Sequence, residues 1–221
     1  MSSRVTLTFD NGPTPGITDQ VLDVLGEHGV RATFFVVGRR LEEAGARALA
    51  ERAVSEGHWV GNHTMTHERQ FGDVDDPEHA VTEIVAAQQA INGLSHPDRL
   101  FRPYGGGGVL SSRLLTQAAV RTLEDGRYTC VLWNCVPRDW QRPETWMATC
   151  LNDIETRPWS LVVLHDEDTG AMSHLSAFLA ELTARGVELR HDFPDECVPI
   201  RRGRLTGSIN DLLLPPDRSA S

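Results

Sequence analysis

The sequence predicts an α/β protein whose strands run parallel in an open sheet or a barrel. Short runs rich in β-branched and aromatic residues alternate with longer amphipathic stretches, as expected when strands alternate with helices. Two of the short runs, ATFFVV (32–37) and SLVVL (160–164), are almost continuously apolar, which is typical of parallel strands buried on both faces. With 221 residues and 40% hydrophobic content, the chain can bury one well-packed core.

The individual elements follow from this alternation. The expected strands are Val5–Phe9, Ala32–Val37, His58–Gly61, Leu100–Arg102, Arg127–Asn134, Ser160–Leu164 and Val187–Leu189. The expected helices lie near 18–28, 40–56, 77–93, 110–119, 143–157 and 172–185. Gly29, Gly57 and Gly186 each follow one of these helices, and we expect them to end it, because glycine readily adopts the left-handed conformation of a helix C-cap.

Composition and charge limit the classes of protein. The net charge is −10, and no cluster of basic residues is long enough to follow a phosphate backbone, so nucleic acid is not an expected partner. No stretch approaches the roughly 18 apolar residues that a membrane span needs. The first strand begins within a few residues of Met1, which leaves no room for a signal peptide and predicts a cytoplasmic protein. We expect one domain over residues 1–200 and a peripheral tail over 201–221.

Sulfur and imidazole side chains give two further expectations. The four cysteines form no CxxC pair and are expected to be buried free thiols. The histidines outside the motifs below (28, 58, 79, 96, 174 and 191) are expected on the surface or on helices.

Most of the expected strands end in polar or conformationally unusual residues. In a parallel α/β fold the carboxyl ends of the strands meet at one edge, so these side chains should gather in space. They are Asp10, Asn11, His63, His67, Arg102, Tyr104, Gly105, Asp139, Trp140 and His165.

His63 and His67 lie four residues apart after the third strand. One helical turn, or a tight loop of that size, would bring both imidazoles within reach of a single ion, although a solvated or capping pair has the same spacing. Two imidazoles and one oxygen ligand would form an open site of the zinc or iron type, with positions left for water and substrate.

The ordered motifs TFDNGP, HTMTH, FRPYG, RDW and LVVLH resemble those of the polysaccharide deacetylases, carbohydrate esterase family 4 or the NodB-homology domain. That family carries TFDDGP, H-S/T-x-x-H, R-x-P-Y/F, D-x-x-D-W and L-x-H, and the match extends over about residues 4–190. The resemblance implies a distorted (β/α) barrel of about seven parallel repeats with the active site at the C-terminal strand ends.

The resemblance also implies a role for each matched residue. Asp10 would be the general base, Arg102 its partner, His165 the general acid and Asp139 the carboxylate that orients His165. Asn11, His63 and His67 would hold a divalent metal, with zinc expected and cobalt or nickel as alternatives. Trp140, Tyr104 and Gly105 would contact substrate, and a backbone N–H near Tyr104 would stabilise the oxyanion.

These roles imply a metal-dependent hydrolase that removes an N-acyl group, acetyl above all, from an amino sugar, an oligosaccharide or a related small metabolite. Such a substrate would be the protein's partner, and the sequence carries no indication of oligomeric state.

Three departures from the family pattern keep two alternatives open. Asn11 replaces the metal-binding Asp, and a neutral amide holds a dication more weakly than a carboxylate does. Val136 replaces the first Asp of the fourth motif, and in the third motif either one proline is lost or Tyr104 has replaced it. The alternatives are a metal-free amide or cyclic-amide hydrolase, and a non-catalytic carbohydrate-binding module. The retained acid–base residues disfavour the module, and Asn11→Asp is expected to tighten metal binding.

Overall fold

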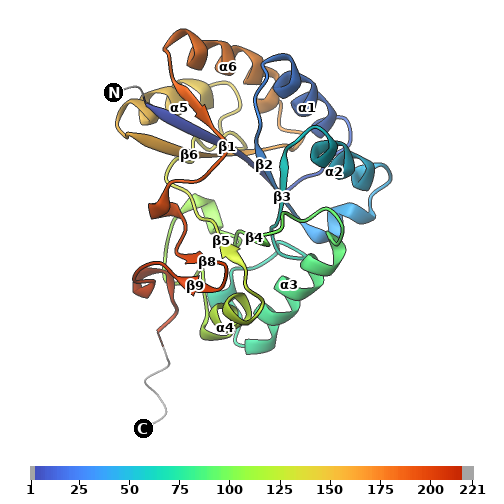
Figure 1. Ribbon diagram of the computed structural model, residues 1–221, viewed down its shortest axis with the longest axis vertical. Coiled ribbons are helices and arrows are strands. Elements are labelled where there is room, and N and C mark those ends of the chain that lie inside the picture. Colours follow the sequence, from blue (N-terminus) through green and yellow to red (C-terminus); the bar gives the residue numbers. More distant parts are fainter. Residues whose placement is uncertain (1–2, 216–221) are drawn as a thin grey trace.

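The computed structural model describes residues 3–215 and shows a mostly parallel sheet that curls into a barrel-like shape, with helices outside it (Figure 1). The strands in this part of the chain are β1 (Arg4–Asp10), β2 (Thr33–Val36), β3 (Trp59–Asn62), β4 (Leu100–Phe101), β5 (Thr129–Cys130), β6 (Trp159–His165), β7 (Glu188–Arg190), β8 (Ile200–Arg201) and β9 (Arg204–Leu205).

The strand order is β6-β1-β2-β3-β4-β5-β8-β9, and β7 pairs with β1. Strands β1 to β6 and β7 pair in parallel, whereas β8 and β9 are antiparallel additions at β5. A single parallel bridge between Cys135 and Val162 joins the segment after β5 to β6 and closes the ring. The predicted distorted parallel barrel is therefore confirmed.

Six longer helices pack around the sheet. They are α1 (Thr18–Glu27), α2 (Ala46–Ser55), α3 (Pro77–Ala90), α4 (Gln117–Asp125), α5 (Trp146–Glu155) and α6 (Leu175–Ala184), within residues 3–215. Helices α1, α2, α5 and α6 cover β6, β1 and β2, while α3 and α4 cover the opposite half of the ring (Figure 1). Gly29, Gly57 and Gly186 follow α1, α2 and α6 with φ of 65°, 87° and 67°, which confirms their predicted role as helix ends.

The central strand β1 shows how the pattern of the sequence positions the site. Its apolar residues at positions 5, 7 and 9 pack against the outer helices, and the alternate residues, including Thr8 and Asp10, point into the barrel. The strand is thus buried on both faces. The residues on its inner face end with Asp10, at the C-terminal edge of the sheet.

The predicted strand Arg127–Asn134 was too long, because β5 ends at Cys130. The carbonyls of Val131 and Leu132 accept hydrogen bonds from the Arg102 guanidinium, at 3.1 Å each, instead of joining a strand ladder. A side chain from the neighbouring strand end therefore interrupts the sheet at this point.

The predicted helix at 110–119 was also wrong, because α4 begins at Gln117. The Thr116 hydroxyl accepts the Ala119 N–H at 3.2 Å and caps the helix, while the Leu115 N–H donates to the Leu212 carbonyl at 3.0 Å. The predicted helix at 40–56 is interrupted at Gly45, where φ is 85°, and only its second part is α-helical.

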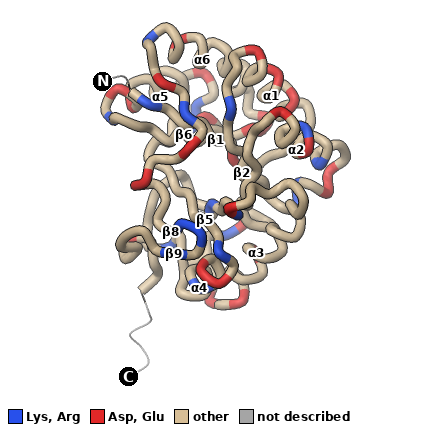
Figure 2. The backbone as a smooth tube through the Cα atoms, in the orientation of Figure 1, with Lys and Arg blue, Asp and Glu red and all other residues tan. Residues whose placement is uncertain are grey.

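The segment after residue 200 folds onto the barrel as far as it is described. The β8–β9 hairpin extends the sheet from β5, and Ile209 is buried in the core. Figure 2 shows a basic stretch at this hairpin, where Arg201 and Arg202 pair with Asp195 and Asp98. Residues 216–221 of the expected tail lie outside the described residues.

The cysteine prediction is confirmed, since all four are buried free thiols. The histidine prediction was wrong for His58 and His191: His58 is buried, and His191 stacks on Trp59 with ring centroids 3.8 Å apart. None of the helices between residues 3 and 215 is both long and apolar enough to cross a membrane.

Candidate active site

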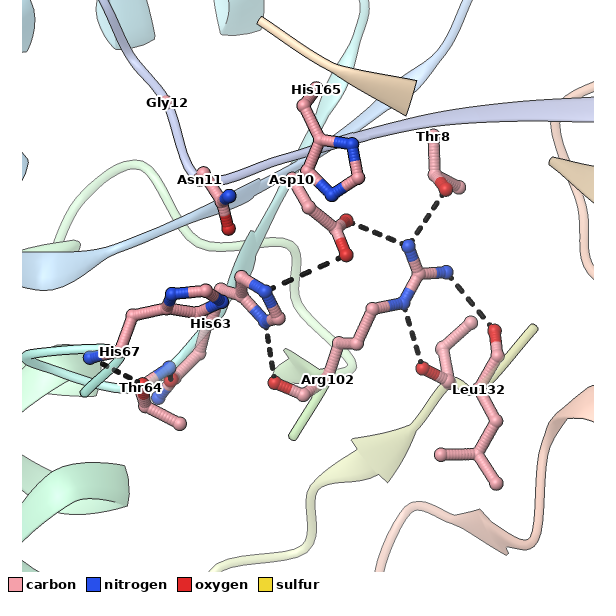
Figure 3. A network of polar contacts seen from close by, with 12 residues as sticks. Thr8, Asp10, Asn11, Gly12, His63, Thr64, His67, Arg102, Leu132 and His165 are labelled. Carbon is pink, nitrogen blue, oxygen red and sulfur yellow. Dashed lines mark hydrogen bonds and ion pairs between the residues drawn. The ribbon is translucent and has the colours of Figure 1, made fainter. Parts of the chain in front are cut away.

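The residues predicted from the motifs converge on one cavity of about 180 Å³ at the C-terminal ends of the strands (Figure 3). Those that line it are Asp10, Asn11, His63, His67, Tyr104, Gly105, Trp140 and His165. Arg102 and Asp139 are fully buried behind this lining and contact Asp10 and His165. The site thus has an inner layer that faces the cavity and an outer layer that holds it.

Arg102 fixes one oxygen of Asp10. Its Nη1 donates to Asp10 Oδ1 and to the Thr8 hydroxyl, both at 2.7 Å, and its guanidinium lies 4.0 Å from the centre of the Phe35 ring. Since other guanidinium nitrogens are bound to backbone carbonyls, the arginine cannot rotate without losing several hydrogen bonds. The second carboxylate oxygen, Oδ2, is left facing the histidines (Figure 3).

The expected general acid lies beside the expected base. Asp10 and His165 are register partners on the parallel strands β1 and β6, so their Cα atoms are direct neighbours across the sheet. His165 Nδ1–H donates to Asp139 Oδ1 at 2.8 Å, and the backbone N–H of His165 donates to Oδ2 at 2.8 Å. Two bonds to one carboxylate fix the ring and leave Nε2 as its free nitrogen.

Burial of the His165 imidazole opposes its protonation. The hydrogen bond and charge of Asp139, together with the charges of Asp10 and Glu167, outweigh that effect and raise the pKa of His165 above its ordinary value. The arrangement favours the protonated ring, which is the form that a general acid requires.

His63 and His67 are held as neutral imidazoles. Burial is the main cause that lowers the pKa of His63 to about 3 and that of His67 to about 2. His63 Nδ1 lies 2.9 Å from the Arg102 carbonyl, which can only accept, so Nδ1 carries the proton and Nε2 carries a lone pair. The two ring centroids are 4.7 Å apart.

Asn11 completes this edge of the cavity. Its φ of 80° is left-handed, a conformation that Asn tolerates better than most residues. The side-chain Nδ2–H donates to Glu167 Oε2 at 3.1 Å, while the buried Oδ1 has no hydrogen-bond partner. The amide therefore presents an unsatisfied oxygen to the site, and such atoms are rare in folded proteins.

The loop that carries His67 is built on Glu83 of α3. The Glu83 carboxylate accepts the N–H groups of Met65 and Thr66, at 3.0 and 2.8 Å, and the Thr66 hydroxyl at 3.0 Å. Thr64 and His67 both have positive φ, 66° and 57°. A buried carboxylate thus holds a strained turn in which both imidazoles face the same space.

Aromatic side chains also line the cavity. Tyr104 lies against His67 with ring centroids 4.2 Å apart, and Trp140 meets the His165 ring edge-on at 4.6 Å. A Cβ at Gly105 would lie 2.3 Å from Trp133, so only glycine allows the loop to approach that indole.

Sequence reasoning missed several residues of the site. Trp133 and Glu167 line the cavity, and the next residue after His165, Asp166, is buried outside its lining and accepts from the Gly12 N–H at 3.1 Å and from the Thr18 hydroxyl. Burial raises the pKa of Asp166 to about 6. The acidic run HDED directly after β6 was the available signal, because a strand end at this edge places each following residue near the site.

The side chains of the cavity can hold a metal ion only if Asn11 is one of the ligands. No group of three or more His, Cys, Asp or Glu side chains in the described part of the chain is arranged to hold an ion. Yet the lone pair of His63 Nε2 faces Asp10 Oδ2 at 3.5 Å, and the Asn11 oxygen beside them has no donor. Lone pairs that face one another with no donor hydrogen to join them are suited to a cation. Two imidazoles together with oxygen ligands suit zinc and neighbouring transition metals.

The barrel, with a carboxylate and an imidazole side by side at its strand ends, places the molecule among the α/β-barrel hydrolases. The family model described as polysaccharide deacetylase matches residues 2–123, and the chain belongs to the polysaccharide deacetylase family.

Individual relatives agree with this membership. A chitooligosaccharide deacetylase of Bradyrhizobium sp. (strain ANU 289) is 38% identical over 167 residues, 73% of this chain and 70% of that protein. A peptidoglycan-N-acetylglucosamine deacetylase of Bacillus cereus is 30% identical over 189 residues, 82% and 83% of the two chains. The solved family 4 acetyl xylan esterase from Clostridium thermocellum in complex with a cobalt ion superposes with a TM-score of 0.69 and 27% identity, covering 86% of this chain and 88% of that one.

Proposed function

We propose that the protein is a metal-dependent N-deacetylase that acts on short N-acetylated amino-sugar oligomers. The observation that carries this proposal is the pairing of Asp10 with His165 in register across β1 and β6, each held by its own buried partner. A base and an acid that lie side by side, each fixed by a separate partner, suit the hydrolysis of an unactivated amide.

His63, His67 and Asn11 would hold the cation. A bound divalent ion supplies a Lewis acid that polarises the amide carbonyl and makes water more acidic. Zinc is the metal we propose, and the cobalt ion present in the structure of the acetyl xylan esterase supports a divalent metal.

The chain's own residues would move the protons. Asp10, with Oδ1 bound to Arg102, would accept at Oδ2 the proton of the water that attacks the amide carbon. The backbone N–H near Tyr104 would stabilise the oxyanion, and His165 would donate a proton to the amide nitrogen as the C–N bond breaks. One water is consumed, and the products are a free amine and acetate.

The cavity supports a short substrate. At about 180 Å³ and open to solvent, it can receive the acetamido group with the sugar ring that carries it, while Trp140 and Tyr104 offer faces for stacking. The chitooligosaccharide deacetylase among the relatives supports the choice of an N-acetylated sugar oligomer.

Metal removal tests the proposal. We expect acetate release from N-acetylated chitooligosaccharides to fall to background after chelation and to return with zinc, cobalt or nickel. His63→Ala and His67→Ala should abolish the recovery, whereas the exposed His174→Ala should recover fully. Full activity after chelation would support a metal-free amidase instead, and binding of these sugars without acetate release at any metal concentration would support a binding module.

The dependence of kcat/KM on pH tests the assignment of His165 as the general acid. Asp139→Asn removes the carboxylate charge that raises the pKa of His165, so the ring should lose its proton at a lower pH. We therefore expect kcat/KM to fall on the alkaline side at a lower pH than in the natural protein. The charges of Asp10 and Glu167 remain in this variant, so part of the elevation should persist. An alkaline limb at an unchanged pH would contradict the assignment of His165 as proton donor.

A further inference from the structure

The carboxylate that the first motif lacks at position 11 is present on Glu167, a neighbouring residue of the cavity wall. Glu167 Oε2 accepts the Asn11 Nδ2–H at 3.1 Å, and the Glu167 side chain also lines the cavity. Because a carboxylate cannot donate, the NH₂ group of Asn11 must point towards Glu167, and Oδ1 must point away from it. Glu167 therefore determines that the oxygen of the Asn11 amide, and not its nitrogen, faces the cavity.

A second contact holds Glu167 in place. Its other oxygen, Oε1, accepts from Arg40 Nη2 at 3.2 Å, and Arg40 Nη1 reaches Glu43 at 3.0 Å. The Glu167 side chain is 27% exposed, so its charge is screened less than that of a free surface carboxylate. Arg40, Glu167 and Asn11 form a short chain of hydrogen bonds that begins at the surface and ends at the unsatisfied Oδ1.

We propose that Glu167 is a positioning residue that orients the Asn11 amide for a divalent cation and supplies the negative charge that Asn11 lacks. A hydrogen bond to an ionised acceptor polarises an amide and makes its oxygen a stronger ligand. This inference rests on the proposed function, since it concerns how the same site holds its metal.

The proposal changes what Asn11→Asp should do. An aspartate at position 11 would face Glu167 at the distance of the present hydrogen bond, and two carboxylates in that position repel each other. The single change should therefore gain little affinity or lose some. In the double variant Asn11→Asp with Glu167→Gln, the glutamine amide donates a hydrogen bond to the new carboxylate. The negative charge then lies on residue 11, the side chain that would bind the metal.

The experiment is a set of zinc affinities measured by competition with a chromophoric chelator, with the cobalt absorption spectrum as a second readout. We expect Glu167→Gln to bind zinc about 10- to 100-fold more weakly, the cost typical of losing a partner behind a metal ligand. Glu43→Gln is the matched control, because it removes the same charge from the same arginine without touching Asn11; its effect should stay below about threefold. The double variant should bind zinc at least as tightly as the natural protein.

Thermal unfolding of the metal-free variants separates binding from folding, and His63→Ala/His67→Ala defines the baseline without a site. If the natural protein binds no tighter than that baseline, the proposed function fails. If its binding depends on the histidines but Glu167→Gln matches it, the function stands and the role of Glu167 is refuted. Additive effects of Asn11→Asp and Glu167→Gln would also refute the coupling.

Discussion

Replacing Arg102 with methionine is expected to destabilise the protein by about 3–5 kcal/mol, the usual cost of leaving one member of a buried ion pair alone. Arg102 is completely buried and binds Asp10, Thr8 and the carbonyls of Val131 and Leu132. Methionine keeps much of the volume but leaves these acceptors without donors. Chemical denaturation of the two proteins would measure the difference in free energy of unfolding.

Two comparisons isolate the cause of that loss. Arg113→Met removes an arginine whose side chain is 63% exposed beside Asp73, and it should cost less than about 1 kcal/mol. Adding Asp10→Asn to Arg102→Met removes the unpaired charge, so the double variant should lose less than the sum of the single variants. A loss for Arg102→Met as small as that for Arg113→Met would show that the buried network contributes little to stability.

Replacing Asp10 with asparagine is expected to lower kcat/KM by about 100- to 10,000-fold, the usual contribution of a positioned base. The substitution preserves the size of the side chain, and an amide cannot accept the proton of the attacking water. Acetate release from N-acetylated chitooligosaccharides would measure the effect, with zinc saturation verified for both proteins.

Asp166→Asn provides the matched comparison for this change. Asp166 is also a buried carboxylate, but it binds Gly12 and Thr18 and does not line the cavity, and burial raises its pKa to about 6. Its replacement should change thermal stability more than turnover. An intact rate in Asp10→Asn would show that the base has been assigned to the wrong residue.

Elements whose boundaries depend on local chemistry were predictable from the sequence. The apolar runs of β2 and β6 and the glycines after α1, α2 and α6 lie where the pattern placed them. Elements whose boundaries depend on distant partners could not be predicted in this way. Strand β5 is cut short by the side chain of Arg102, and α4 starts late because Leu115 binds Leu212. No property of residues 127–134 or 110–119 alone contains this information.

The same division applies to the site. Residues within recognisable motifs, from Asp10 to His165, could be assigned to one cavity because parallel strands bring their C-terminal ends together. Glu83, Trp133 and Glu167 were missed because their contacts join segments that are separate in the sequence. Their importance depends on which loops meet, and that becomes visible only in three dimensions.

The closure of the barrel by a single bridge between Cys135 and Val162 ties two functional segments together. One side of that seam leads within four residues to Asp139, and the other side leads within three residues to His165. This join is therefore also a link between His165, the expected proton donor, and the carboxylate that raises its pKa. Asp139 and His165 thus lie on the two sides of one seam, and their two direct hydrogen bonds, at 2.8 Å each, reinforce the closure of the ring.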